Sequence, residues 1–296
     1  MARRYDTVSF LSDYGVRDEL VGVVKSVLRD LAPHATVIDL AHGIAPFDIR
    51  AGSLALARAI PYVASGIVLG VVDPGVGTMR KAVAIEVGGG EGVLVGPDNG
   101  LLAPAVAIAG GAERAVVLTN EAYQLAAPGP TFAGRDVFAP VAAHLCNGVD
   151  LFELGDPIDA DALVPGVVPL PRDEAGSVVC EVLWVDRFGN CQLNVGPDEV
   201  ESLGSPLQVS VGDLAGDPVV RVATRAVTFD RIGVGAVGLV TDSSGMFALA
   251  LARRSAADEL GLAAGDQVLL SPLGEGDSGA VSVRVSLGTP AQPAGR

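Results

Sequence analysis

Residues 66–72 of the chain read GIVLGVV, an apolar run without a polar face. A strand of this kind is buried on both sides, as in a parallel sheet that helices cover. The sequence before it alternates between apolar strands, at residues 7–11 and 36–40, and segments of helical spacing, at residues 20–31 and 49–60. Strand, helix, strand, helix and strand in this order are typical of right-handed βαβ units. We therefore predict an α/β fold whose N-terminal domain is a mostly parallel, Rossmann-like sheet flanked by helices.

The second half of the chain has a different pattern. A proline-rich connection at residues 150–176 separates it from the first half. Beyond this connection, short valine-rich runs alternate with glycine and aspartate turns, as in an antiparallel sandwich or barrel. The runs are residues 178–185, 191–194, 207–211, 219–223, 236–240, 267–270 and 281–285. We predict an N-terminal α/β domain at residues 1–165 and a C-terminal antiparallel, β-barrel-like domain at residues 176–290.

The composition limits the partners that the chain can have. Of its 296 residues, 35 are Asp or Glu and 20 are Lys or Arg, which gives a net charge of −15. Because an acidic surface repels phosphate backbones, we expect no nucleic-acid partner. The longest apolar stretch, near residues 60–72, is interrupted by Pro61 and is too short to span a bilayer. We therefore expect no membrane partner and, without a signal-peptide core at the N-terminus, a cytoplasmic location.

The cysteines and histidines form no recognisable metal or redox motif. Cys146, Cys180 and Cys191 are odd in number and lack CxxC spacing, which fits a reducing compartment. The three histidines share no metal-ligand spacing, and no nucleophile elbow is present. We therefore expect a site without a metal or another cofactor.

Two aspartates follow strands of the predicted sheet. Asp13 comes after the first strand and Asp73 after the third. Ligands of parallel sheets bind beyond the carboxyl ends of the strands, where an aspartate can accept the hydroxyls of a ribose. Each aspartate can instead cap its own loop as an Asx-turn, and spacing alone leaves both interpretations open. Arg80 lies seven residues after Asp73. It can fold back to pair with Asp73 and fix the orientation of that carboxylate.

Other polar motifs have a simple structural interpretation. Asp98 or Asn99, within the sequence PDNGLL, is placed to cap a helix. Asp136 is placed at the positive end of a helix expected over residues 137–144. The polar segments of the second half are expected at hairpin tips, which are generally polar. Spacing alone therefore predicts caps and turns at these positions.

The motifs taken together resemble one family. In chain order they are SDYG (12–15), IAPFDI (44–49), VDPGVGT (72–78) followed by Arg80, PDNGLL (97–102), residues 132–140 and DRFGN (186–190). This set, which extends over about residues 7–270, resembles the S-adenosylmethionine (SAM) hydroxide adenosyltransferases, the hydrolase relatives of the SAM-dependent fluorinase and chlorinase. The resemblance implies that water attacks the ribose C5′ of SAM and releases adenosine and L-methionine. It also implies a homotrimer whose sites lie between the N-terminal domain of one subunit and the C-terminal domain of the next.

The resemblance further implies roles for single residues. The catalytic residues that would orient the attacking water are Asp73 and Arg80. The substrate-binding residues would be Asp13 at the ribose hydroxyls, Phe47 beside the ribose, Asp186 and Ser243 at the methionine end, and Asn190, Phe229 and the backbone near Leu251 at the adenine. SAM is the substrate, and the resemblance implies no metal and no separate cofactor.

One position departs from the family pattern, and two alternatives stay open. Hydrolases of the family usually carry a histidine where this chain has Ala133. A non-catalytic sensor of SAM or adenosine fits that loss, although the retained Asp73 and Arg80 argue against it.

A chlorinase-like halogenase is the other alternative. Halogenating relatives, however, carry a tyrosine at the position of Asp73, where a carboxylate repels a halide. The sequence therefore favours hydrolysis.

Overall fold

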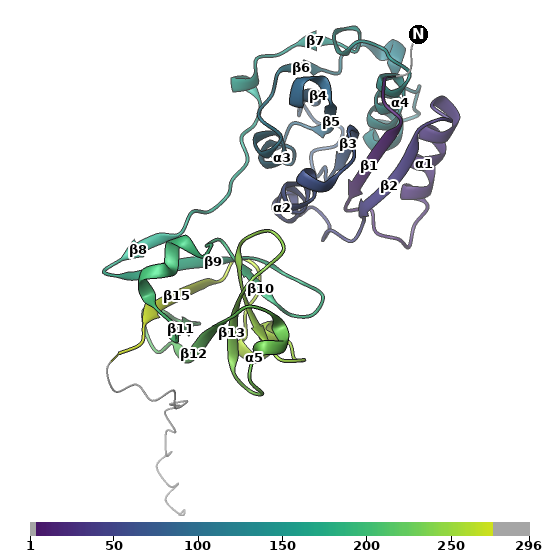
Figure 1. Ribbon diagram of the computed structural model, residues 1–296. Coiled ribbons are helices and arrows are strands. Elements are labelled where there is room, and N and C mark those ends of the chain that lie inside the picture. Colours follow the sequence, from purple (N-terminus) through teal and green to yellow (C-terminus); the bar gives the residue numbers. More distant parts are fainter. Residues whose placement is uncertain (1–3, 275–296) are drawn as a thin grey trace, which may run out of the picture. The chain divides into compact units, whose positions relative to one another are not determined.

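The computed structural model describes residues 4–274 of the chain. The chain divides into two compact units, Met1–Val168 and Pro169–Arg296, and each contains its own hydrophobic core (Figure 1). The strand expected at residues 281–285 and the end of the predicted C-terminal domain, from residue 275 to 290, lie outside the described residues. None of the helices in the described part of the chain has both the length and the apolar character needed to cross a membrane.

The first unit is built on a seven-stranded sheet with the order β2-β1-β3-β5-β4-β6-β7. Its strands are β1 (Thr7–Ser12), β2 (Thr36–Ala41), β3 (Gly66–Val71), β4 (Ala82–Val87), β5 (Gly92–Pro97), β6 (Arg114–Val117) and β7 (Asp156–Pro157). The neighbours β2, β1, β3 and β5 are parallel, whereas β4 is antiparallel to β5 and β6, and β7 is antiparallel to β6. The predicted, mostly parallel sheet is therefore confirmed, and the first three strands begin where the sequence predicts.

Helices cover both faces of this sheet (Figure 1). The longer ones are α1 (Leu20–Leu31), α2 (Ile49–Ala59), α3 (Ala103–Ile108) and α4 (Ala139–Cys146), and the short turns are η1 (Ile60–Tyr62), η2 (Gly88–Gly90), η3 (Glu121–Tyr123), η4 (Gly134–Phe138), η5 (Leu151–Glu153) and η6 (Ala160–Ala162). Successive side chains of β1 point to opposite faces. Phe10 therefore lies in one apolar cluster with Leu28 of α1, and Leu11 lies in another with Leu56 of α2. The absence of a polar face in the central strands follows from this double burial.

Two central strands approach each other closely at glycines. A Cβ atom added to Gly96 of β5 would lie 2.3 Å from the carbonyl oxygen of Gly70 in β3. Real carbon and oxygen atoms do not approach so closely, so a side chain at residue 96 would force the strands apart. Glycine therefore permits the pairing that holds β3, the strand leading to Asp73.

The second unit is a closed β-barrel. Its strands are β8 (Arg172–Glu174), β9 (Ser177–Val185), β10 (Cys191–Leu193), β11 (Leu207–Val211), β12 (Val219–Ala226), β13 (Val237–Thr241), β14 (Phe247–Leu251) and β15 (Gln267–Pro272), joined by η7 (Asp198–Leu203), η8 (Phe229–Arg231) and α5 (Ala256–Leu260). The order is β10-β14-β13-β12-β11-β15-β9, and β9 pairs with β10 to close the ring, while β8 extends the sheet beyond β9. The predicted barrel-like domain is therefore confirmed.

The barrel differs in detail from the predicted one. The expected runs before residue 275 are all strands, but the sequence patterns did not predict β8 and β14. One pair, β12–β13, is parallel, whereas the other pairs among the described strands are antiparallel. The connection that carries η8 runs back along the barrel instead of reversing in a hairpin, and such a crossover places the next strand parallel to the last.

Candidate active site

Asp13 and Asp73 lie at the same edge of the first unit's sheet. Asp13 follows β1, and its backbone N–H donates to the carbonyl of Val71, 3.3 Å away, at the end of β3. Val71 precedes Asp73 by two residues and is paired with Ser12 in the parallel ladder. The two carboxylates therefore occupy the carboxyl edge of neighbouring strands, where ligands of parallel sheets bind.

Asp73 and Arg80 form a buried ion pair. The Nε of Arg80 donates to both carboxylate oxygens of Asp73, at 2.8 and 3.0 Å, and a terminal nitrogen of the guanidinium donates to Oδ2. Only 6% of the Asp73 side chain and 15% of the Arg80 side chain are exposed. The guanidinium carbon also lies 5.3 Å from the centre of the Phe138 ring, a cation–π contact. The predicted pairing is confirmed, and it holds the carboxylate in one orientation.

Asn99 supports Asp73, and sequence reasoning missed this role. Its Nδ2 donates to the carbonyl of Val72, 2.9 Å away, immediately before Asp73, and its Oδ1 accepts from the backbone of Leu101. The predicted helix cap at Asp98 or Asn99 is wrong, because α3 begins later, after Leu102, and has no side-chain cap. The amide of Asn99 instead ties the loop after β5 to the end of β3. A contact between segments so far apart in sequence leaves no spacing signal.

Tyr14 is a second residue of this site to which the sequence predicted no role beyond its place in the SDYG motif. Its ring packs edge-on against Phe132, with centroids 5.6 Å apart. A Cβ added to Gly134 would lie 2.3 Å from the Tyr14 hydroxyl oxygen, so the hydroxyl lies against this backbone, beside Ala133. Burial raises the pKa of Tyr14, and the nearby carboxylates of Asp13 and Asp73 raise it further. The phenol is therefore protonated and neutral at physiological pH.

The segment that faces Tyr14 is an unusual helical turn. The expected helix start at residue 137 is wrong, because a π-helical turn, η4, precedes α4 without a break. Asp136 lies inside this turn, where it is buried and paired with Arg135, and does not cap a helix. Single π turns are frequent at functional sites because the wider turn redirects side chains.

Phe47 is held outside the core by its backbone. Its φ angle is 69°, in the left-handed region that non-glycine residues rarely adopt, and 71% of the residue is exposed. Its backbone N–H donates to Oδ2 of Asp13 at 2.9 Å. A bulky residue in this conformation costs about 1–3 kcal/mol and is found mainly where a site requires it. The backbone of Phe47 thus lies beside the carboxylate that is expected to meet a ribose.

In the second unit, the structure brings Asp186 and Asn190 together. Oδ1 of Asp186 accepts from the backbone N–H groups of Phe188 and Asn190, at 2.8 and 2.9 Å, and Oδ2 accepts from the Asn190 side chain at 2.8 Å. Asp186 thus organises the tip of the β9–β10 hairpin in the manner of an Asx-turn. The prediction that this polar segment lies at a hairpin tip is therefore confirmed. The Phe188 side chain is exposed at the surface.

The remaining predicted residues of this unit lie in different elements. Ser243 is exposed at the tip between β13 and β14, where Asp242 accepts from the backbone of Ser244 at 2.8 Å. Phe229 is half-exposed in η8. Leu251 ends β14 and is buried.

Sequence comparison assigns both units to one family. Residues 8–155 match the SAM hydroxide adenosyltransferase N-terminal domain, and residues 180–269 match the C-terminal domain of the same family. The chain belongs to the SAM hydroxide adenosyltransferases.

Three named relatives and one solved structure match this chain over 90–99% of their own length. A protein of Salinispora tropica named (R)-S-adenosyl-L-methionine hydrolase is 43% identical over 261 residues, which cover 88% of this chain and 96% of the relative. A protein of the same name from Thermus thermophilus is 40% identical over 89% of this chain and 98% of its own. A fluorinase of an Actinoplanes species is more distant, at 27% identity over 82% of this chain and 90% of the fluorinase. The crystal structure of a conserved protein from Thermotoga maritima superposes with a TM-score of 0.81 at 32% identity and covers 89% of this chain and 99% of that one.

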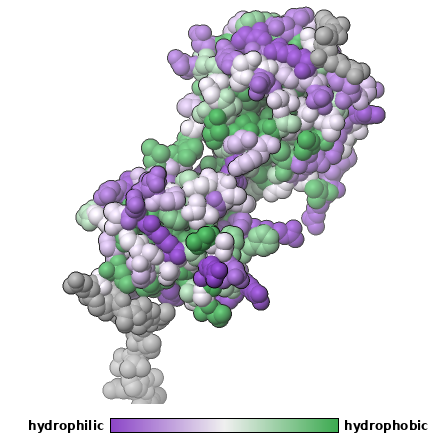
Figure 2. All heavy atoms as spheres, in the orientation of Figure 1, coloured by the Kyte–Doolittle hydropathy of each residue, from purple (hydrophilic) through white to green (hydrophobic). Residues whose placement is uncertain are grey.

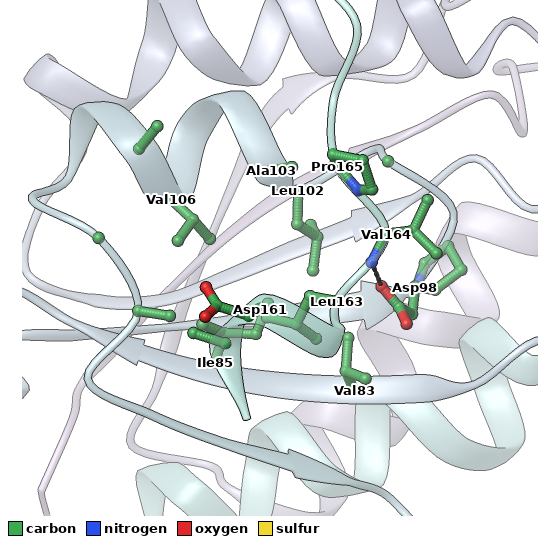
Figure 3. A pocket seen from close by; sticks show the side chains of 16 residues that line it. Val83, Ile85, Asp98, Leu102, Ala103, Val106, Asp161, Leu163, Val164 and Pro165 are labelled. Carbon is green, nitrogen blue, oxygen red and sulfur yellow. Dashed lines mark hydrogen bonds between the residues drawn. The ribbon is translucent and has the colours of Figure 1, made fainter. Parts of the chain in front are cut away.

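A hollow of about 430 Å³ in the first unit is separate from the predicted site. It lies between α3, β4 and the segment 160–165, and its walls are mainly apolar (Figure 3). Asp98 stands at its edge, where Oδ1 accepts from the backbone of Val164 at 2.8 Å. None of the predicted site residues lines this hollow. The Asp73–Arg80 edge, and not this hollow, is therefore the candidate active site.

Proposed function

We propose that this protein hydrolyses SAM by attack of water on the ribose C5′, with adenosine and L-methionine as products. The observation that carries the proposal is the buried Asp73–Arg80 pair at the carboxyl edge of the sheet. Membership of the family and the hydrolase names of the relatives at 40–43% identity support it. Because those names specify the (R) configuration at sulfur, we propose (R)-S-adenosyl-L-methionine as the preferred epimer.

The proposed step requires positioning rather than acid catalysis. The leaving group is a neutral thioether that departs from a sulfonium, so it needs no proton. Asp73 accepts a hydrogen bond from the water and directs a lone pair toward C5′, while Arg80 keeps the carboxylate oriented. Positioning of this kind contributes up to about 7–11 kcal/mol to lowering a barrier. The carboxylate then accepts the proton that the attacking water loses.

We propose that the substrate is bound by residues of both units. Asp13 and Phe47 surround the ribose in this proposal. The residues proposed for the rest of the molecule are Asp186 and Ser243 for the methionine end, and Asn190, Phe229 and the Leu251 backbone for the adenine. In this proposal no cofactor besides the substrate takes part.

We also propose a cytoplasmic location, which is supported by three buried cysteines with free thiols.

We further propose a homotrimer with sites at the subunit interfaces. Large apolar side chains at the surface of both units support this proposal, because exposed apolar patches mark interaction sites (Figure 2). Phe47 and Met79 are 71% and 97% exposed in the first unit, and Phe188 and Val234 are 77% and 102% exposed in the second. Contacts between subunits would cover such groups.

The proposed reaction is tested by incubating the purified chain with the (R) and (S) epimers of SAM in oxygen-18 water that contains chloride. We expect adenosine that carries the label in its 5′-hydroxyl, formed faster from the (R) epimer. Chlorodeoxyadenosine as the main product would instead identify a halogenase. Tight binding by calorimetry without any adenosine over several hours would identify a sensor. An Asp73→Ala variant that forms adenosine as fast as the wild type would overturn the role of Asp73.

A further inference from the structure

Four polar side chains form a continuous hydrogen-bonded chain below the turn that carries Asp13. Nζ of Lys25 donates to Oδ2 of Asp39 at 2.9 Å, and Oδ1 of Asp39 lies 3.1 Å from Nε2 of His42. Nδ1 of His42 lies 2.8 Å from Oγ of Ser12, the residue immediately before Asp13. We call Ser12, His42 and Asp39 the relay.

The inner end of the relay is buried. Ser12 has no exposed surface and His42 is 8% exposed, whereas Asp39 has 45% of its side chain exposed. The Phe10 ring packs edge-on against His42, with centroids 4.7 Å apart. An irregularity in the β1–β2 pairing, where Phe10 faces Asp39 but Leu11 faces Ala41, redirects the end of β2 toward Ser12. Buried polar groups of this kind are kept because each one has a hydrogen-bond partner.

The donors and acceptors of the relay are consistent from end to end. The Asp39 carboxylate accepts from His42 Nε2–H, which leaves Nδ1 as the acceptor for the Ser12 hydroxyl. The Ser12 oxygen in turn accepts from the backbone N–H of Tyr14 at 3.4 Å. The carbonyl of His42 also accepts from the backbone N–H of Gly15 at 2.7 Å. Both ends of the turn at residues 12–15 are therefore tied to the relay.

The order serine, histidine and aspartate resembles a nucleophilic triad, but the geometry excludes that use. A nucleophile must reach its substrate, and Ser12 has no exposed surface. Its hydroxyl oxygen is already engaged with Tyr14 and His42. The relay therefore acts on the turn above it and not on the substrate directly.

We propose that Ser12 and His42 are positioning residues that hold the turn at residues 12–15 so that the carboxylate of Asp13 meets the ribose hydroxyls. The inference rests on the proposed function, since Asp13 is assigned there to the ribose. From outside the turn, the Phe47 backbone N–H donates a hydrogen bond to the Asp13 side chain at 2.9 Å, which is one constraint on the carboxylate. The relay supplies the second constraint, through the backbone on either side of Asp13.

The test compares binding of adenosine and of 2′,3′-dideoxyadenosine by calorimetry. In Ser12→Ala and His42→Phe we expect the affinity for adenosine to fall about 10- to 100-fold, as for a lost hydrogen bond to a charged group. The affinity for dideoxyadenosine, which lacks both hydroxyls, changes less than about threefold. In an Asp13→Ala background, His42→Phe no longer affects adenosine binding, because the coupled group is absent.

Two further variants separate positioning from general damage. Ser53→Ala removes another buried hydroxyl of the same unit, which donates to the Arg50 carbonyl at 2.8 Å, and should change neither affinity. Asp39→Asn alters the exposed end of the relay, so we expect this variant to fold even where the buried variants do not. It should selectively weaken the binding of adenosine by about 3- to 10-fold.

Three outcomes are decisive. Selective loss of adenosine binding supports the positioning role. Equal weakening of both nucleosides, or unchanged discrimination in all the variants, overturns that role while the wild type still binds adenosine. A wild type that binds neither nucleoside overturns the proposed function, and the positioning role falls with it.

Discussion

Asp73 has only 6% of its side chain exposed, and the ion pair with Arg80 compensates for the burial of its charge. Asp73→Asn keeps the size of the side chain but removes the acceptor charge. We expect kcat to fall about 100-fold or more, with adenosine affinity changed only a few-fold, because in the proposed mechanism Asp73 directs water and does not hold the nucleoside. Steady-state kinetics and calorimetry measure the two quantities.

The matched control for this change is Glu86→Gln. Glu86 is also buried and paired with two arginines, Arg4 and Arg114, but it lies on β4 and outside the predicted site. Hydrogen bonding to Arg114 lowers the pKa of Glu86, so its loss should reduce stability while kcat stays the same. A similar loss of kcat in both variants would show that Asp73 acts only through stability.

The backbone strain at Phe47 makes a separate prediction. Phe47→Gly relieves the positive φ, so we expect the free energy of unfolding to rise by up to about 1 kcal/mol. The same change removes the ring and should weaken adenosine binding about 3- to 10-fold. Phe47→Ala serves as the control, since it removes the ring but retains the strain. A stability loss in Phe47→Gly, measured by urea denaturation, would contradict this account.

At the level of single residues, sequence reasoning found charges that follow strands and missed the groups that hold them. Asp13 and Asp73 are recognisable because they end apolar runs, and the partner of Asp73 lies only seven residues away. Asn99 and His42 reach across about 30 residues to a carbonyl or a hydroxyl. Such contacts depend on which strands are neighbours, and a single sequence does not contain that information.

Among the elements, close packing of β3 and β5 makes Gly96 sensitive to substitution. Gly96→Ala places a methyl group against the Gly70 carbonyl, and we expect it to destabilise the protein by about 2 kcal/mol or more. Gly22 in α1 is the matched control, since a Cβ there meets nothing within 4 Å. Gly22→Ala should stabilise the protein by about 0.5–1 kcal/mol. Chemical denaturation of both variants distinguishes close approach from a general intolerance of alanine.

The helices and strands that were predicted well are those whose apolar residues follow a clear pattern along the sequence. α1 spans the residues that the helical spacing indicates, and β1 and β3 begin at the predicted residues. The predictions were wrong where the direction of the chain or local packing determines the structure. Parallel pairing of β12 with β13 depends on the path of an irregular connection, and the late start of α3 depends on Asn99 bonding elsewhere. Neither the parallel pairing nor the late start of the helix can be recognised from the neighbouring sequence.

At the scale of the whole molecule, mixing subunits tests the proposed interface sites. In the proposed trimer, an Asp73→Ala subunit would lack the first half of a site, and an Asp186→Ala subunit would lack the second. In a mixed trimer one junction combines two intact halves, so random mixing should restore about a quarter of wild-type activity from two inactive proteins. Mixtures assembled after denaturation and refolding are assayed for adenosine release. No recovery at all would mean that each site is built from a single chain.

The reactivity of the three cysteine thiols can be used to test whether both units are folded. Burial raises the pKa of Cys146, Cys180 and Cys191 to about 12 each. Because the folded pKa values lie above the unfolded value of about 8.5, the unfolded state loses its thiol protons at a lower pH than the folded state does, and stability falls as the pH rises between these values. We expect a thiol reagent to label the native protein slowly at about pH 8, and the free energy of unfolding to fall as the pH rises from about 8.5 toward about 12. Rapid labelling of all three thiols in the native state would contradict their burial.

Closure of the barrel between β9 and β10 determines how the second unit can meet other chains. A ring of strands leaves no row of unpaired backbone groups, and β8, which lies outside the ring, carries only the charged residues Arg172, Asp173 and Glu174. Charged edges oppose the addition of a foreign strand. Association through this unit therefore relies on side-chain recognition by its tips and loops, and shared sheets between copies, the usual route into fibrils, are disfavoured.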